Sequence, residues 1–184
     1  MSRKVHVFEI GALRRELPLF EVKPGLSIAV LNILGDVELV EAAAAALVPR
    51  LETLGATALV TPEAKSIPLV YALAVRLKLP YVVLRKNCKS YMGDALSVST
   101  NSITTGAQQT LYLDEKDHAL IEHAPVVLVD DVVSTGSTLH AMRTLMQRAN
   151  ARVVGETAIC TEGAPEDWPD VIALGHLPLF TDGA

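Results

Sequence analysis

The sequence is poor in aromatic side chains. Only 4% of its 184 residues are Phe, Tyr or Trp, although 50% are hydrophobic. Its core must therefore consist mostly of Ala, Val, Leu and Ile, which suits buried parallel strands flanked by helices better than a β-sandwich. The composition favours an α/β fold, and the length suits a single domain spanning residues 1–184.

The sequence also lacks an excess of basic charge, paired cysteines and long apolar runs. Its net charge is −5, which argues against a general nucleic-acid binder because such a protein presents a positive field to phosphates. The two cysteines, Cys88 and Cys160, have no metal-ligand spacing and are expected to be reduced thiols. With no span-length apolar stretch and no signal-peptide pattern, we expect a cytoplasmic protein without a membrane partner.

Alternation and helical spacing outline the secondary structure. Strands are expected at residues 5–10, 26–33, 58–60, 81–84, 126–129 and 153–160. Helices are expected after Asp36, a candidate N-cap, at residues 67–77, and from Leu139 onward. Pro49 should kink or end the first helix. The strand–helix–strand order predicts parallel strand pairs.

Two polar stretches interrupt this pattern. Residues 14–25 carry charges, two prolines and a glycine and are expected to form a loop. Residues 86–110 are rich in Ser, Thr, Asn and Gly, with little apolar periodicity. A connection this long is usually functional or mobile, and we expect a mobile loop or a loose hairpin.

The segment Val126–Leu139, VVLVDDVVSTGSTL, carries the strongest chemical signal. It predicts an apolar strand that ends at Asp130 and Asp131, followed by the turn Asp130–Thr138 and a helix. Ligands of α/β proteins bind at that edge of the sheet. Unpaired N–H groups at the helix start, the helix dipole, four hydroxyls and the flexible Gly136 favour a phosphate. Carboxylates, as pure acceptors, favour sugar hydroxyls, so a pentose 5-phosphate satisfies both halves.

The same residues also fit an ordinary strand-to-helix turn with an N-cap and two solvated acids. The coincidence of strand, paired acids, hydroxyl-rich turn and helix in one order favours the functional interpretation. Two other phosphate motifs, G-x-x-x-x-G-K-[ST] and G-x-G-x-x-G, are missing from the sequence. We also expect Mg²⁺ near Asp130 and Asp131, held indirectly through substrate oxygens and water.

Val126–Leu139 resembles the phosphoribosyl pyrophosphate signature of type I phosphoribosyltransferases. The resemblance extends more weakly over most of the chain and is best for the adenine and xanthine branches, with Pro24-Gly25, Arg85-Lys86 and a helix–strand unit after the signature. It implies a central, mostly parallel sheet flanked by helices, with a small hood from the N-terminal segment and the C-terminal tail. It further implies a homodimer that transfers ribose 5-phosphate from phosphoribosyl pyrophosphate to a purine base, with Mg²⁺ as cofactor and pyrophosphate as product.

By this resemblance, Asp130 and Asp131 bind the ribose hydroxyls and steer Mg²⁺, and together with Lys86 they form the expected catalytic set. Residues 63–66 match the family's pyrophosphate loop, which often contains a non-proline cis peptide. The implied substrate-binding residues are Glu63, Ala64, Lys65, Ser66, Arg85, Lys86, Lys89, Asp130, Asp131, Val132, Val133, Ser134, Thr135, Gly136, Ser137 and Thr138. For the lysines and Arg85, the alternative is a solvated surface cation.

Two further regions are implied by the resemblance. Residues 89–109 match the family's flexible catalytic loop, which closes over the substrate and excludes water. The polar candidates in that loop are Lys89, Tyr91, Ser102 and Thr105. Base recognition is expected from the hood. The apolar candidates for it are Leu31, Leu177 and Phe180, with core packing as the alternative.

The base is the least defined part of this expectation. Adenine enzymes of the family commonly carry a T-G-G-T turn followed by an acid, and an aromatic residue that stacks on the base. Here Gly136-Ser137 replaces Gly-Gly, His140 is expected to be a surface residue with no acid close behind, and residues 26–33 contain no Phe. We expect adenine first and xanthine or hypoxanthine next. A non-catalytic sensor of phosphoribosyl pyrophosphate or nucleotides and an orotate-type enzyme are the alternatives.

Overall fold

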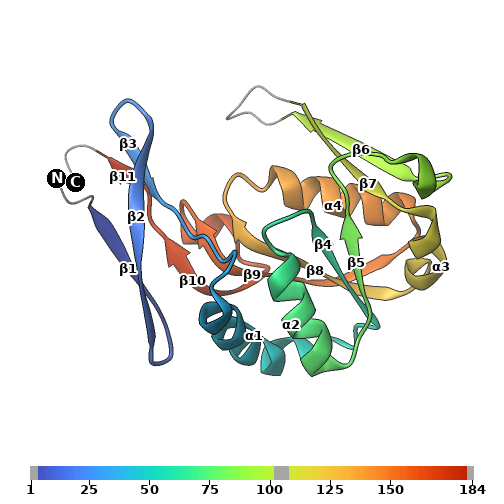
Figure 1. Ribbon diagram of the computed structural model, residues 1–184, viewed down its shortest axis with the longest axis horizontal. Helices are drawn as coiled ribbons and strands as arrows, with labels where there is room; N and C mark the ends of the chain where they lie inside the picture. Colours follow the sequence, from blue (N-terminus) through green and yellow to red (C-terminus); the bar gives the residue numbers. More distant parts are fainter. Residues whose placement is uncertain (1–3, 102–107, 182–184) are drawn as a thin grey trace.

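The computed structural model describes residues 4–101 and 108–181, whose strands form the three sheets drawn in Figure 1. The central sheet has five strands in the order β10-β9-β8-β4-β5, and all four pairings are parallel. Its strands are β4 (Ala58–Pro62), β5 (Tyr81–Leu84), β8 (Pro125–Val133), β9 (Arg152–Glu162) and β10 (Val171–Leu177). The predicted α/β class with a mostly parallel sheet is therefore confirmed.

Helices cover both faces of this sheet (Figure 1). They are α1 (Val37–Leu51), α2 (Ile67–Leu77), α3 (His118–Ile121) and α4 (Ser137–Arg148), with short 3₁₀ turns at Glu52–Leu54, Ser90–Met92, Glu115–Asp117 and Pro165–Asp167. Leu59 and Val127 face the core under α1 and α2, whereas Val60 and Leu128 face the core under α4. Burial on both faces explains why these strands are continuously apolar.

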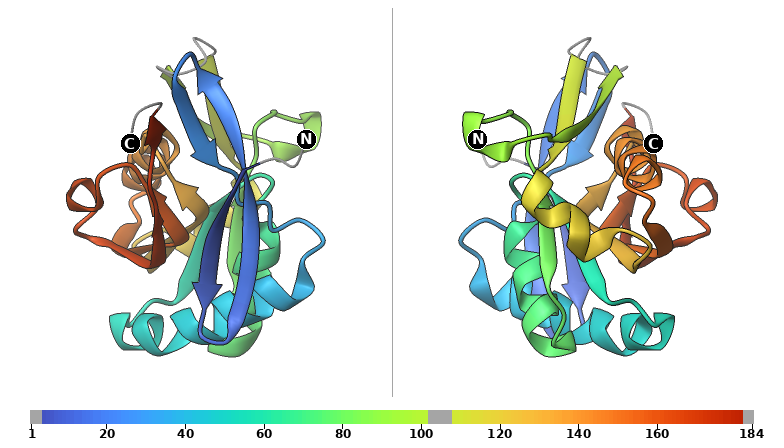
Figure 2. Two further views of the ribbon diagram at one scale, coloured as in Figure 1. Left: turned by 90° about the vertical axis from the view of Figure 1, so that its left-hand side faces the viewer. Right: turned by 90° about the vertical axis from the view of Figure 1, so that its right-hand side faces the viewer.

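A second sheet forms the hood at one end of the molecule (Figure 2, left). Its antiparallel strands are β1 (Val5–Ile10), β2 (Leu13–Lys23), β3 (Leu26–Ala29) and β11 (Phe180–Thr181). The hood thus combines N-terminal and C-terminal segments, as the resemblance implied. Toward the opposite end (Figure 1; Figure 2, right), β6 (Leu96–Asn101) and β7 (Gln108–Leu113) form a hairpin.

The expectation of a loop at residues 14–25 was wrong, because most of this segment belongs to β2. Pro18 favoured the loop prediction, because a proline lacks the N–H that a strand ladder uses. In the structure Pro18 lies where β2 changes partner: residues up to Pro18 pair with β1, and Leu19 onward pairs with β3. Only the Pro24-Gly25 turn remains outside the sheet, with Gly25 at φ 75°.

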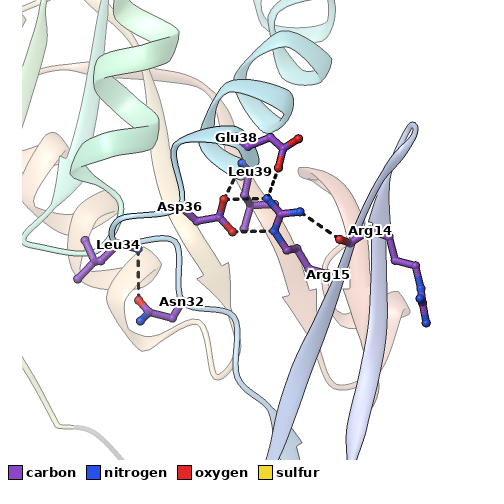
Figure 3. A network of polar contacts seen from close by, with 7 residues as sticks. All are labelled: Arg14, Arg15, Asn32, Leu34, Asp36, Glu38 and Leu39. Atoms are coloured by element: carbon purple, nitrogen blue, oxygen red, sulfur yellow. Dashed lines mark hydrogen bonds and ion pairs between the residues drawn. The ribbon is translucent and has the colours of Figure 1, made fainter.

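An ion-pair cluster ties the hood to the first helix (Figure 3). The Arg15 Nε lies 2.7 Å from Asp36 Oδ2, and an Arg15 Nη lies 2.9 Å from Asp36 Oδ1 and 2.8 Å from Glu38 Oε2. Asp36 Oδ1 also accepts a bond of 3.0 Å from the main-chain N–H of Leu39, which confirms the predicted N-cap. These contacts, chiefly the guanidinium of Arg15, lower the pKa of Asp36.

Most other element predictions are confirmed, with shifted ends. The helix at 67–77 and the strands at 5–10 and 81–84 have the predicted bounds. Pro49 lies inside α1, which ends at Leu51. The strand expected at 26–33 ends at Ala29, and both cysteines are free thiols. Among the helices of the described residues, none is both long and apolar enough to cross a membrane.

Candidate active site

The carboxyl ends of four neighbouring strands bring the predicted residues to one edge of the central sheet. β8 leads into the Ser134–Thr138 segment, here called the phosphate turn. β4 leads into residues 63–66, β5 into Arg85 and Lys86, and β9 ends at Glu162. Parallel strands place all these segments on the same side, where α/β proteins bind ligands.

The phosphate turn surrounds a cavity of about 200 Å³, lined by Gln109, Asp130, Val132, Val133, Ser134, Thr135, Gly136, Ser137, Thr138 and Leu139. Gly136 precedes α4 with φ 72°, and no side chain caps the helix start among the described residues. The first N–H groups of α4 therefore have no side-chain acceptor and favour an anion. Ser134 Oγ accepts a bond of 2.7 Å from the Thr135 N–H, and Thr135 Oγ1 lies 3.2 Å from Ser137 Oγ.

The indole of Trp168 packs closely against Gly136 of the phosphate turn. A Cβ atom added to Gly136 would lie 2.6 Å from the Trp168 ring, so a larger residue at that position would displace the indole. The Trp168 Nε1–H donates a bond of 3.0 Å to the main-chain oxygen of Glu162. Glycine is therefore required at this turn both for its positive φ and for its close packing.

Asp130 and Asp131, here called the acidic pair, lie within β8 rather than in the turn, because β8 continues to Val133. This corrects the predicted start of the turn. Asp130 is buried, and its Oδ1 accepts a bond of 2.9 Å from the Asp131 N–H. Burial, followed by the charge of Asp131, raises the pKa of Asp130 to about 8. Without a bound donor or cation, the pair therefore resists carrying two negative charges.

A second cavity of about 250 Å³ adjoins the first and is lined by Pro62, Glu63, Ala64, Lys65, Ser66, Lys86, Asp130, Asp131, Val132 and Thr138. The Glu63–Ala64 peptide bond is cis, as the resemblance implied. The buried Ser66 hydroxyl lies 3.1 Å from the Pro62 oxygen and 2.9 Å from Thr61 Oγ1. It therefore helps to hold the shape of the 63–66 loop.

The four expected cations are placed differently. Lys65 and Lys86 line the second cavity. The main-chain N–H of Lys86 donates a bond of 2.9 Å to Glu63 Oε2. Arg85 Nε lies 3.2 Å from the same oxygen, and the Arg85 main chain bonds to Tyr112 in both directions at 2.8 Å. The Lys86 N–H and then Arg85 lower the pKa of Glu63. Neither Arg85 nor Lys89 is among the residues that line the two cavities.

The polar segment after β5 forms the expected hairpin only in part. The hairpin packs on α4, where an Arg148 Nη donates to the Ser97 oxygen at 2.6 Å. Tyr91 is 69% exposed, and Ser102 and Thr105 lie outside the described residues. Gln109 of β7 lines the phosphate cavity. It is the last residue of the range 89–109 expected to form the flexible loop, but it was not among the polar candidates named there, because the sequence did not define the course of the hairpin.

A third cavity of about 510 Å³, the hood cavity, lies between the hood and the phosphate turn. Its lining residues are Val22, Lys23, Leu26, Ile28, Ser134, Thr135, Glu162, Gly163 and Leu179. The apolar residues Leu31, Leu177 and Phe180, expected here from the sequence, instead belong to the core or pack against it. Glu162 was missed, although its place at the end of a strand next to β8 could have indicated it.

In the part of the chain that the structure describes, no group of three or more His, Cys, Asp or Glu side chains converges on a possible metal position. The acidic pair supplies only two carboxylates beside the second cavity. Such a pair fits Mg²⁺ only if substrate oxygens and water complete the octahedral shell, which is how Mg²⁺ is usually held.

Comparison with known proteins links this site to a family. A model of the phosphoribosyl transferase domain matches residues 32–173. A hypoxanthine/guanine phosphoribosyltransferase of Methanocaldococcus jannaschii is 36% identical over 99 residues, covering 54% of this chain and 50% of the relative. The purine biosynthesis transcriptional repressor PurR of Bacillus subtilis is 33% identical over 95 residues, covering 52% and 33%. The chain thus spans about half or less of the length of these curated relatives.

Solved structures support the same fold at low sequence identity. Adenine phosphoribosyltransferase from Thermoanaerobacter pseudethanolicus superposes with a TM-score of 0.66 at 20% identity, covering 94% of this chain and 95% of that one. The Giardia lamblia enzyme, solved with 9-deazaadenine, gives a TM-score of 0.67 at 17% identity, covering 94% and 93%. The match of the family model to most of the sequence, including the acidic pair and the phosphate turn, shows that this chain belongs to the phosphoribosyl transferase domain family.

Proposed function

We propose that this protein transfers ribose 5-phosphate from phosphoribosyl pyrophosphate to a purine base and releases pyrophosphate. One observation carries the proposal: the three cavities adjoin one another and share lining residues. The phosphate cavity shares Asp130, Val132 and Thr138 with the 63–66 cavity. It shares Ser134 and Thr135 with the hood cavity. Pyrophosphate, ribose 5-phosphate and base would thus occupy neighbouring spaces.

Each cavity has the chemistry that its part of the substrate requires. The phosphate turn offers helix N–H groups and hydroxyls to the 5-phosphate. The acidic pair offers acceptors to the ribose hydroxyls and would hold Mg²⁺ through substrate oxygens and water. Mg²⁺ supplies charge neutralisation on the leaving pyrophosphate. Lys65 and Lys86 line the cavity assigned to that group and add positive charge where negative charge develops.

The hood cavity supports a planar heterocycle as acceptor. Its walls combine apolar side chains from β2, β3 and the segment before β11 with a few polar groups. Small-molecule sites commonly have this composition, in which apolar walls bind the ring and polar groups orient it. The similar proteins named above, two purine phosphoribosyltransferases and a repressor of purine biosynthesis, favour a purine.

A second candidate is a sensor that binds phosphoribosyl pyrophosphate or a nucleotide without turnover. The similarity to the repressor PurR favours it, since that regulator shares about a third of the aligned residues. The described residues retain both acids and the complete phosphate turn, so binding is expected in either case.

Pyrophosphate release distinguishes the two candidates. The protein is incubated with Mg²⁺, phosphoribosyl pyrophosphate and, in turn, adenine, guanine, hypoxanthine, xanthine or orotate. Release with a purine supports the transferase. Calorimetric binding of phosphoribosyl pyrophosphate without release on any base supports the sensor. Asp131→Asn should weaken that binding, while Asp167→Asn, an exposed acid outside the three cavities, serves as the matched control.

A further inference from the structure

The hood cavity contains two charged side chains, and they come from different layers of the fold. Lys23 is the last residue of β2 in the hood, and Glu162 is the last residue of β9 in the central sheet. The remaining side chains that line this cavity are apolar or carry hydroxyls. A planar base in this space would therefore meet one cationic donor and one anionic acceptor.

Glu162 is held in place through its main chain, and its carboxylate is left for a ligand. The Glu162 main-chain oxygen accepts the Trp168 indole N–H at 3.0 Å, and the residue pairs with Leu177 of β10. No hydrogen bond to its carboxylate is found within residues 4–101 and 108–181. The pKa of Glu162 is raised above its usual value, because the effect of burial exceeds the opposing effect of nearby His176. A half-buried acceptor of this kind is stabilised by a ligand that donates to it.

Lys23 lines the same cavity from the hood, on a backbone of irregular geometry. The pairing of β2 with β3 shifts register between Glu21 and Lys23, and Gly25 follows at φ 75°. Lys23 pairs with Leu26 after this shift, and it is exposed and lines the cavity. Lysine donates hydrogen bonds and accepts none.

The two side chains discriminate between purine edges. A 6-oxopurine presents an acceptor at O6 and a donor at N1, and guanine adds a second donor at N2. Adenine presents the reverse, a donor at N6 and an acceptor at N1. A carboxylate facing the N1 edge therefore attracts guanine or hypoxanthine and repels the N1 lone pair of adenine.

We propose that Glu162 and Lys23 make the hood cavity selective for 6-oxopurines, guanine foremost, over adenine. Glu162 accepts from the N1–H and the exocyclic amine, and Lys23 donates to O6. The inference rests on the proposed function, because it assigns the hood cavity to the base. It reverses the order expected from the sequence, in which adenine came first.

Binding of nucleoside monophosphates tests this selectivity without requiring turnover. Dissociation constants for GMP, IMP and AMP are measured by calorimetry on the full chain and on Glu162→Gln, Lys23→Met and Glu166→Gln. Glu166 is an exposed acid outside the hood cavity and serves as the matched control. Thermal unfolding of each variant verifies that it is folded.

The full chain should bind GMP at least about tenfold more tightly than AMP, the size of effect that a charge-assisted hydrogen bond produces. Glu162→Gln should reduce this preference by about tenfold, because a glutamine amide can also face the adenine edge. Lys23→Met should weaken GMP and IMP together, and Glu166→Gln should change nothing. Equal or tighter binding of AMP, a preference unchanged by Glu162→Gln, or no binding of any of the three nucleotides overturns the inference.

Parallel pyrophosphate-release assays separate this inference from the proposed function. Release with adenine but not with guanine or hypoxanthine contradicts the selectivity and supports the transferase. A GMP preference that depends on Glu162, without release on any base, supports the selectivity and contradicts the transferase.

Discussion

Replacing Asp130 by Asn should stabilise the protein at pH 8 and weaken its binding of phosphoribosyl pyrophosphate. Burial, and after it the charge of Asp131, raises the pKa of Asp130 from 3.8 to about 8. A carboxyl group with a raised pKa binds its proton more tightly in the folded state than in the unfolded chain. Its contribution to stability therefore declines as the pH rises from about 4 toward 8.

The size of the effect follows from this difference in proton affinity. Each tenfold change in proton binding corresponds to about 1.4 kcal/mol, so the Asp130 carboxyl opposes folding by about 4 kcal/mol at pH 7 and by on the order of 1–2 kcal/mol at pH 5. Asn removes the charge, and its Oδ1 can accept the bond that Asp130 Oδ1 receives from the Asp131 N–H. After relaxation, we expect Asp130→Asn to be about 2–4 kcal/mol more stable at pH 8 and clearly less so at pH 5.

Urea denaturation of both proteins at pH 5 and pH 8 measures this difference directly. Comparing the variant with the parent at each pH cancels the titration of all other groups. Asp167→Asn, at an exposed acid, should show no such pH dependence. A stability difference that is the same at both pH values, or a variant that is less stable at pH 8, would refute the reasoning. Calorimetry should show weaker phosphoribosyl pyrophosphate binding by the stabilised variant.

Three further outcomes are expected. Gly136→Ala should lower the unfolding free energy by about 1–3 kcal/mol. Gly35→Ala should lower it less, because Gly35 has a positive φ but no atom within 4 Å of an added Cβ. Equal losses in the two variants would contradict the contact of Gly136 with Trp168. Trp168 is the single tryptophan, so ribose 5-phosphate should change its emission by binding to the phosphate turn, and unaltered fluorescence at a concentration where calorimetry detects binding would argue against that placement. Asp36→Ala should lower the unfolding free energy by about 1 kcal/mol, because the N-cap is lost, and should accelerate amide hydrogen exchange in the hood. Arg15→Ala should accelerate exchange in the hood but leave the N-cap intact. Unchanged exchange in both variants would show that the ion pairs do not hold the hood.

The central sheet and the phosphate turn were accessible from the sequence because local patterns determine them. The apolar run before Asp130 is long enough to indicate a strand buried on both faces. The order of hydroxyls, Gly136 and helical spacing then indicates a helix start. Asp36 was predicted as an N-cap for the same local reason. The extension of β8 through the acidic pair was missed, because two charged residues usually end an apolar strand.

The hood and its cavity were harder to predict because they depend on contacts between distant segments. From the local sequence, Pro18 predicts the end of a strand, because proline lacks the N–H that a strand ladder uses. It is tolerated in β2 because the strand changes its pairing partner at this residue. Lys23 and Glu162 are far apart in sequence, and they line the same cavity only because the hood packs on the central sheet. Arg85 was expected among the substrate-binding residues, and its pairing with Glu63 could not be inferred from sequence spacing. The homodimer and the cytoplasmic location stay predictions.

The division of the site among separate strand ends has an evolutionary consequence. The phosphate turn and acidic pair belong to the central sheet, whereas most of the hood cavity comes from β2, β3 and the segment before β11. Under the proposed function, substitutions in those hood segments would change which ring is accepted, while the residues assigned to sugar and phosphate stay unchanged. A new base preference would then arise through substitutions in peripheral strands, without an intermediate form that no longer binds phosphoribosyl pyrophosphate.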